Sequence, residues 1–170
     1  MPYESIFRPG LFAGQVHVVT GGGSGIGLFT AHELASLGAL VVVTGRRREK
    51  LEAVAAEIAE DGGRADWLAF DIRDDAAVTE NIAEALKRHG RIDGLVNNAG
   101  GQFPARLEDI SRNGWNAVVA TNLTGGFLVA REVYRQWMKA HGGAIVNIIA
   151  DMWRSMVEMG HSGAARAGMM

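Results

Sequence analysis

Cysteine is absent from this 170-residue chain, and proline occurs only three times. The lack of cysteine excludes a disulfide framework, a thiol nucleophile and a thiolate metal site. The five histidines are scattered without the spacing of metal ligands, so we expect no metal centre. Neither sign of charge dominates, with 17 Lys and Arg against 19 Asp and Glu, so we do not expect nucleic acid as a partner.

Long hydrophobic runs are also lacking, and none approaches the ~20 residues that a membrane-spanning helix needs. The first residues, Met1–Ser5, do not have the basic and then apolar regions of a signal peptide. The final Gly168-Met169-Met170 is not a peroxisomal address. These absences predict no membrane association and a cytoplasmic protein.

Glycine, in contrast, is abundant, and its densest cluster is the stretch TGGGSGIG over residues 20–27. This stretch lies between an apolar run and an amphipathic segment, which predicts a turn from a strand into a helix. Glycine allows the backbone to approach a phosphate, and a helix N-terminus offers unpaired N–H groups. The spacing therefore predicts a pyrophosphate site formed by Gly21, Ser24, Gly25, Ile26 and Gly27; the alternative is a glycine-rich loop without a ligand.

Strand and helix patterns alternate from residue 15 onward, which is typical of a parallel α/β sheet. Residues 1–14 are expected to be an irregular leader, and residues 15–170 a single nucleotide-binding domain. The predicted strands are Gln15–Thr20, Leu40–Thr44, Ala65–Phe70, Gly94–Asn97 and Ala144–Ile149. The predicted helices are Gly25–Leu37, Arg47–Asp61, Asp74–His89 and Ser111–His141, each followed by glycine where a left-handed cap residue is favoured.

The resulting fold class is a Rossmann-type doubly wound parallel sheet with five strands. In the strand order 3-2-1-4-5-6 of such sheets, the fifth strand would be left as an unfinished edge. The segment His161–Met170 reads as the first turns of a further helix, so we expect a domain truncated after strand five. The alternative is that these ten residues form a frayed tail.

Arginines follow the second predicted strand, where a dinucleotide fold faces the adenosine ribose. An acidic residue at this position would bind the 2′-hydroxyl of NAD, but the sequence has Arg46 and Arg47 instead. Guanidinium groups suit a 2′-phosphate, which predicts NADP(H) as the cofactor. The alternative is a solvated basic helix start, although cations are unfavourable at a helix N-terminus.

Three further candidate sites with polar residues lie after the third predicted strand, after the fourth, and within the long predicted helix. Asp71-Ile72 ends the third strand, where the carboxylate suits the adenine amino group or simply caps a turn. Asn98, Ala99 and Gly100 close the fourth strand with residues that let the backbone approach a ligand. Asn122 interrupts the long helix, where a polar side chain can divert backbone hydrogen bonds, or is only a helix-facing amide.

With TGGGSGIG, NNAG and the TN of the long helix in this order, the chain resembles the short-chain dehydrogenase/reductase superfamily. The stretches GGQF, GWNA, WMKAHGG and HSGAARAG are similar to its peroxisomal trans-2-enoyl-CoA reductase branch, whose members use NADPH in fatty acid metabolism. The resemblance implies that the glycine loop holds pyrophosphate, Arg46 the 2′-phosphate and Asp71 the adenine. It further implies that Asn98 to Gly100 line the adenosine and ribose, and that Asn122 supports a proton-relay water.

The sequence departs from the superfamily where catalysis is expected, because the family's Ser and Tyr-x-x-x-Lys are missing. Ile149 or Ala150 stands at the serine position, while Ser162 and Arg166 stand where tyrosine and lysine should fall. The two tyrosines, at positions 3 and 134, precede the fold and lie on the long helix. The candidate catalytic residues that remain are Asn122, Ser162 and Arg166. Ser162 is a poor substitute for tyrosine because serine is a weaker acid, and Arg166 could hold the ribose but could not shuttle a proton.

Two residues outside these motifs carry weaker expectations. His161 is either an acid or, more simply, a capping or solvated side chain, and His17 is expected to be a satisfied core histidine. The apolar segment around Met152 and Trp153 is expected to cover the substrate cleft or the missing part of the sheet.

Several functions agree with this pattern. The first is an NADPH-dependent reductase that acts on a small molecule, an acyl-CoA enoyl thioester or a carbonyl compound, and that forms a homo-oligomer if the chain is complete. An alcohol or aldehyde dehydrogenase is its nearest sibling. The alternatives of another class are a non-catalytic NADP-binding remnant and a chain that associates through its open sheet edge.

Overall fold

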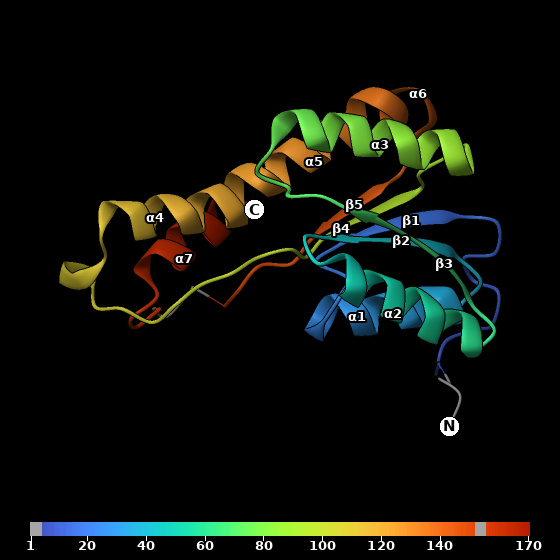
Figure 1. Cartoon of the computed structure of the whole chain (residues 1–170), viewed down its shortest axis with the longest axis horizontal. Helices are drawn as coiled ribbons and strands as arrows, with labels where there is room; N and C mark the ends of the chain where they lie inside the picture. The colour runs from blue at the N-terminus through green and yellow to red at the C-terminus, as the bar shows by residue number, and fades with distance from the viewer. Residues whose placement is uncertain (1–4, 152–155) are drawn as a thin grey trace.

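A five-stranded parallel sheet forms the centre of the protein, as seen in a computed structural model that describes residues 5–151 and 156–170. The strand order is β3-β2-β1-β4-β5, which confirms the predicted doubly wound arrangement (Figure 1). Every neighbouring pair is parallel, and β5 has no further neighbour among the described residues. The strands are β1 Val16–Thr20, β2 Leu40–Gly45, β3 Arg64–Ala69, β4 Gly94–Asn97 and β5 Ala144–Asn147.

Helices cover both faces of the sheet (Figure 1). On one face lie α1 Gly25–Ser36 and α2 Arg48–Glu60, and on the other α3 Asp75–His89, α5 Gly125–Val133 and α6 Lys139–His141. The short η1 Leu107–Asp109, α4 Arg112–Val119 and α7 Gly160–Ala167 extend beyond the edge of the sheet. None of the helices in the described part of the chain has the length and apolar character needed to cross a membrane.

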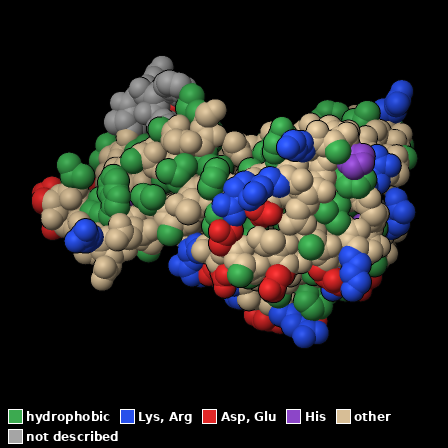
Figure 2. Space-filling model, turned by 90° about the horizontal axis from the view of Figure 1, so that it is seen from above, with side chains coloured by type: hydrophobic (Ala, Val, Ile, Leu, Met, Phe, Trp, Pro, Cys, Tyr) green, Lys and Arg blue, Asp and Glu red, His purple; other side chains and the backbone are tan. Residues whose placement is uncertain are grey.

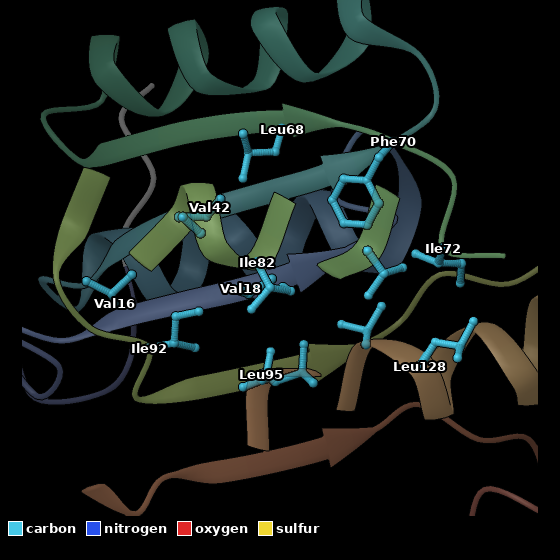
Figure 3. Packing of buried hydrophobic residues seen from close by; sticks show 14 of the residues in the cluster. Val16, Val18, Val42, Leu68, Phe70, Ile72, Ile82, Ile92, Leu95 and Leu128 are labelled. Atoms are coloured by element: carbon cyan, nitrogen blue, oxygen red, sulfur yellow. The ribbon is translucent and has the colours of Figure 1, made fainter. Parts of the chain in front are cut away.

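The core has two halves, one on each side of the sheet. Val18 and Val42 point toward α3 and α5 with the cluster shown in Figure 3, whereas their neighbours Val19 and Val43 pack toward α1 and α2. Successive strand residues face opposite sides, so a strand with helices on both faces must be apolar throughout. This explains why the runs VHVVT and LVVVTG are almost continuously hydrophobic.

The third helix shows how local chemistry sets a helix boundary. The Asp74 carboxylate accepts a hydrogen bond of 3.1 Å from the Ala77 N–H, and therefore caps the first turn. At the other end, Gly90 takes the left-handed conformation with φ of 76° and ends the helix. The sequence predicted both ends of this helix within one residue.

The predicted single helix over Ser111–His141 is wrong in detail, because two π-helical turns divide it. These turns are η2 Ala120–Thr124 and η3 Tyr134–Met138, and they separate α4, α5 and α6. Asn122 lies in the first turn and is 1% exposed. Its side-chain amide bonds to a distant loop, and π turns of this kind are frequent at functional sites.

Thr20 joins the ends of β1 and β4. Its Oγ1 accepts hydrogen bonds from the backbone N–H groups of Asn98 and Ala99, both at 3.0 Å, and donates to the Val96 carbonyl at 3.3 Å. Thr44, its partner in the sheet register, is equally buried, but its hydroxyl has no partner among the described residues. The two threonines therefore form a matched pair for an experiment.

We expect Thr20→Val to lower the free energy of unfolding by about 1–3 kcal/mol, because it removes the hydrogen-bond partner of the Ala99 N–H. The Asn98 N–H, in contrast, keeps a bond to the Val96 carbonyl. Thr44→Val should be neutral or stabilising, since no hydrogen bond is lost. Urea denaturation of both variants measures the difference. Equal effects of the two substitutions would contradict a special role of Thr20.

Asp93 connects the start of β1 to the segment before β4. Its Oδ2 accepts hydrogen bonds of 2.8 Å from the Val16 N–H and from the Arg91 Nε. Burial by itself raises the pKa of Asp93, but the bonds from Arg91 and Val16 outweigh it and lower the pKa below its ordinary value. A carboxyl group with a lowered folded pKa stabilises the protein above its unfolded pKa of about 4.

Asp93→Asn should therefore lower the free energy of unfolding by about 1–2 kcal/mol at pH 7. The difference from the wild type should shrink below pH ~4, as the wild-type carboxyl becomes protonated in both states. Urea denaturation at pH 7 and pH 3 tests this, with the exposed Asp109→Asn as control. A gap that stays constant with pH would rule out the carboxylate as its source.

Candidate functional site

A cavity of about 360 Å³ opens where β1, β2 and β4 end. This is the point at which the chain, having moved outward from β1 to β3, returns to the other side of β1, and ligands of doubly wound sheets bind at such a crossing. Predicted residues that line the cavity are Gly21, Ser24, Ile26, Arg46, Arg47, Asp71, Ile72, Asn98, Ala99, Gly100 and Arg166. The predicted residues come from five separate segments of the chain, and the fold brings these segments together around one cavity.

Four predicted site residues, Gly25, Gly27, Asn122 and Ser162, do not line this cavity. Several lining residues were not predicted, and these are Gly23, Gly45, Lys50, Leu51, Phe70, Thr121 and Ile148. Gly23 and Gly45 adjoin predicted motif residues, and proximity was their available signal. Lys50 and Ile148 carried no local signal, because only the folding of α2 and β5 brings them to the cavity.

The glycine loop is packed directly against the end of β4. Gly21 has a φ of 67°, and a Cβ on it would lie 2.9 Å from the Ala99 Cα. A Cβ on Gly27 would lie 2.4 Å from the Asn98 Nδ2, so this glycine supports close packing beneath the loop rather than lining the cavity. Both positions require glycine because the loop packs closely against the segment after β4.

The first turn of α1 faces this cavity without a counter-charge. Ser24 precedes the helix, its side chain makes no capping bond with any described residue, and no acidic residue stands in the first turn. The partial positive charge of a helix N-terminus is therefore available to an anion. Together with the glycine cradle, this arrangement fits a pyrophosphate.

Cations gather at the β2 end of the cavity, where Arg46, Arg47 and Lys50 line the wall. Asp71 also lies there, but its carboxylate accepts hydrogen bonds of 2.9 and 3.0 Å from the Arg73 Nε and one of 3.0 Å from the Arg73 N–H. These bonds from Arg73, with a smaller contribution from Arg46, lower the pKa of Asp71. The turn-capping alternative for Asp71 is therefore present, on a side chain that also lines the cavity.

At the opposite end of the cavity, Asn122 holds the loop that follows β4. Its Oδ1 accepts a 2.9 Å hydrogen bond from the Gly101 N–H, and its Nδ2 donates one of 2.8 Å to the Gly101 carbonyl. Both polar atoms of the buried amide are therefore used on backbone. In this structure Asn122 fixes a loop next to the cavity.

Arg166 reaches the same end from α7. Its Nη1 donates a 2.5 Å hydrogen bond to the Ile148 carbonyl, and burial lowers the pKa of its guanidinium. A Cβ on Gly100 would lie 2.1 Å from the Arg166 Nη2, so glycine is required to admit the guanidinium. Arginine stays protonated in proteins, and Arg166 therefore supplies a positive charge at this end of the cavity.

Ser162, another of the candidate catalytic residues, is fully buried on α7. Its hydroxyl donates a 2.5 Å hydrogen bond to the Gln102 Oε1. His161 is also fully buried, with its ring 4.6 Å from that of Phe103 in an edge-on contact, so the expectation of a capping or solvated side chain is wrong. The reason is tertiary, because α7 packs against α4 and the β4 loop, a contact that local sequence does not reveal.

No tyrosine side chain that could act as proton donor lines the cavity among the described residues. Tyr134 is 52% exposed on η3, while Tyr3, Met152 and Trp153 lie outside the described residues. No described group of three or more His, Asp or Glu side chains is arranged to hold a metal ion. His17 is a buried core residue that bonds to Gln15 at 2.9 Å, as predicted, and burial lowers its pKa.

Several known proteins are similar to this chain. A citronellol catabolism dehydrogenase from Pseudomonas aeruginosa PAO1 is 60% identical with a TM-score of 0.95, over 98% of this chain and 69% of that one. A metagenomic short-chain oxidoreductase in complex with NADP is 38% identical with a TM-score of 0.87, over 93% of this chain and 72% of that one. A peroxisomal 2,4-dienoyl-CoA reductase from Danio rerio is 36% identical over 97% of this chain.

The chain spans 61% and 56% of the length of two curated relatives, the 2,4-dienoyl-CoA reductases of Bacillus subtilis and Danio rerio. Residues 15–168 match the short chain dehydrogenase family, which accounts for the glycine loop, the strand order and the position of the cavity. The chain belongs to the short chain dehydrogenase family.

Proposed function

We propose that this chain carries the NADP(H)-binding part of a reductase that transfers hydride to an enoyl thioester. The observation that carries the proposal is a glycine-lined cavity with cations at both ends, Arg46 and Arg47 at one and Arg166 at the other. In a dinucleotide with a 2′-phosphate, that phosphate suits Arg46 and Arg47 and the pyrophosphate suits the N-terminus of α1, while the neutral hydroxyls of the remaining ribose suit the N–H donors of Arg166. The short-chain oxidoreductase solved with NADP supports the same cofactor.

Each part of the cavity has a role toward this cofactor. The N–H groups at the start of α1 and the backbone of Gly21 hold the pyrophosphate. Arg46 and Arg47 bind the 2′-phosphate, Asp71 and Ile72 contact the adenine, and residues 98–100 line the adenosine and ribose. Arg166 holds the remaining ribose. When bound, NADPH supplies the hydride and is oxidised to NADP+.

An enoyl thioester suits this site better than a ketone does. Reduction of the thioester places hydride on the β-carbon and leaves an enolate, whose oxygen needs a hydrogen-bond donor more than a dedicated acid. Ketone reduction instead needs a proton on the forming alkoxide, and Ser162 is a poor acid whose proton already bonds to Gln102. The names of the two dienoyl-CoA reductase relatives point to the same substrate class.

Two other functions have specific support. The missing Ser-Tyr-Lys set favours a protein that binds NADP without turnover. The relatives named as gluconate 5-dehydrogenase and citronellol catabolism dehydrogenase favour an alcohol or aldehyde substrate. Turnover on a panel of enoyl-CoA, ketone and alcohol substrates separates the three.

A homo-oligomer formed through the long helix is part of the proposal. Hydrophobic side chains gather on the surface of the part that carries α4 (Figure 2, left). Trp115, Phe127 and Tyr134, on α4, α5 and η3, are 38–55% exposed. Apolar surface of this kind is typical of an interface. Cytoplasmic location stays a prediction.

Arg46→Ala should weaken NADPH binding by about 10- to 100-fold, because a charge-assisted phosphate contact contributes about 1.5–3 kcal/mol. Binding of NADH, which has no 2′-phosphate, should change little. Fluorescence titration with both cofactors measures the shift in preference. Arg48→Ala is the matched control, since Arg48 lies outside the cavity and pairs with Glu52; an equal loss for NADH and NADPH in Arg46→Ala would exclude the 2′-phosphate contact.

With NADPH and a short or medium trans-2-enoyl-CoA, the protein in its full natural length should oxidise the cofactor and yield the saturated acyl-CoA. The expected stoichiometry is one NADPH oxidised per double bond reduced, and the loss of NADPH absorbance measures it. Tight NADPH binding without turnover on any substrate of the panel would instead establish the non-catalytic alternative.

A further inference from the structure

Four consecutive residues after β4 are each held by a side chain from a distant helix. Gly100 packs against Arg166, and Gly101 exchanges two hydrogen bonds with Asn122. Gln102 accepts a hydrogen bond from Ser162, and Phe103 makes an edge-on contact with His161. The loop over residues 100–103 is therefore fixed against α7 and η2 along its whole length.

Gln102 is the residue of this loop with unused hydrogen-bonding capacity. Its Oε1 is taken by the fully buried Ser162 hydroxyl, which sets the orientation of the planar amide. The amide nitrogen, Nε2, then points away from that hydroxyl, and it has no partner among the residues that the structure describes. Gln102 is exposed, so its two N–H donors are accessible to a ligand.

The orientation of the proposed cofactor puts its reactive end close to Gln102. With the 2′-phosphate at Arg46, the dinucleotide runs across the ends of β1 and β4 toward Gly100 and Arg166. Its reactive end therefore lies at the Gly100 end of the cavity. Gln102 follows Gly100 by two residues, and it is an exposed residue next to the cavity lining rather than part of it.

We propose that the Gln102 Nε2 donates a hydrogen bond to the thioester oxygen of the substrate, and that Ser162 is the positioning residue that aims this amide. The inference rests on the proposed function. It assigns Ser162 a role other than proton donor and supplies the oxyanion donor that the missing tyrosine would otherwise provide.

The reaction balances without a covalent role for Gln102. A hydride forms the new C–H bond at the β-carbon, the electrons of the C=C bond move toward the thioester oxygen, and the α-carbon takes a proton from water. The cofactor is oxidised and the double bond is reduced. Gln102 keeps both of its protons throughout and stabilises the charge that develops on the oxygen.

The decisive variant is Gln102→Glu, which keeps the shape and the acceptor for Ser162 but removes the donors at neutral pH. We expect kcat for an enoyl-CoA to fall about 100-fold, as on loss of an oxyanion donor. The NADPH dissociation constant, from fluorescence titration, should change less than twofold. Asn116→Asp, an exposed amide on α4, is the matched control for the added charge and should leave kcat unchanged.

Acid pH provides a readout that a purely structural role would not move. The carboxyl introduced by Gln102→Glu regains an O–H donor when it is protonated, so the activity of this variant relative to wild type should recover severalfold between pH 8 and pH ~5. Ser162→Ala should lower kcat about 10-fold through loss of orientation, and Ser162→Thr, which keeps the hydroxyl, should restore most of it. Retention of kcat by Gln102→Glu within twofold would overturn the proposal.

A measurement without turnover separates this inference from the proposed function. If the wild type oxidises no NADPH with any enoyl-CoA, the proposed function fails, and calorimetric binding of a saturated acyl-CoA to the NADP+ complex then tests Gln102 directly. Binding at least 10-fold weaker to Gln102→Glu than to Asn116→Asp supports the contact. Equal binding to both, or no binding to the wild type, overturns it.

Discussion

The close contact between the ends of β1 and β4 is the constraint on which the site depends. Thr20 bonds to the backbone of Asn98 and Ala99, and Gly21 and Gly27 leave no room for a side chain between the two segments. This contact directs the start of α1 toward the gap between the strands, where its N–H groups can meet an anion. A bulkier residue at either glycine would displace the backbone that forms the cavity wall.

A second set of contacts holds the opposite end of the cavity and comes from residues far apart in sequence. The loop over residues 100–103 is fixed by Asn122 from a π turn and by Ser162 and Arg166 from α7. Asn122 lies in the π turn and uses both polar atoms of its amide on Gly101. Rigid helices therefore position a loop, which is how a scaffold gives a loop a defined chemical role.

Much of the fold could be predicted because its signals are local. Apolar strands and the glycines after the helices indicated the element bounds to within one or two residues, and the alternation of strands and helices indicated the doubly wound sheet. The π turns could not be predicted, because the apolar pattern of residues 111–141 agrees with one continuous helix, and the Asn122 contact in the first turn is with a residue 21 positions away. His161 was misjudged for the same reason, since its burial against Phe103 requires α7 to dock on the loop after β4.

The sequence by itself determined the family, the glycine cradle and the cationic end of the cavity, because each depends on short motifs of residues that are neighbours in the chain. Tertiary structure decided what Ser162, Asn122 and Gln102 do. A hydroxyl or amide has the same chemistry wherever it stands, and its role depends on which partner folding brings within about 3 Å. That partner is Gln102 for Ser162 and Gly101 for Asn122, across 60 and 21 residues of chain.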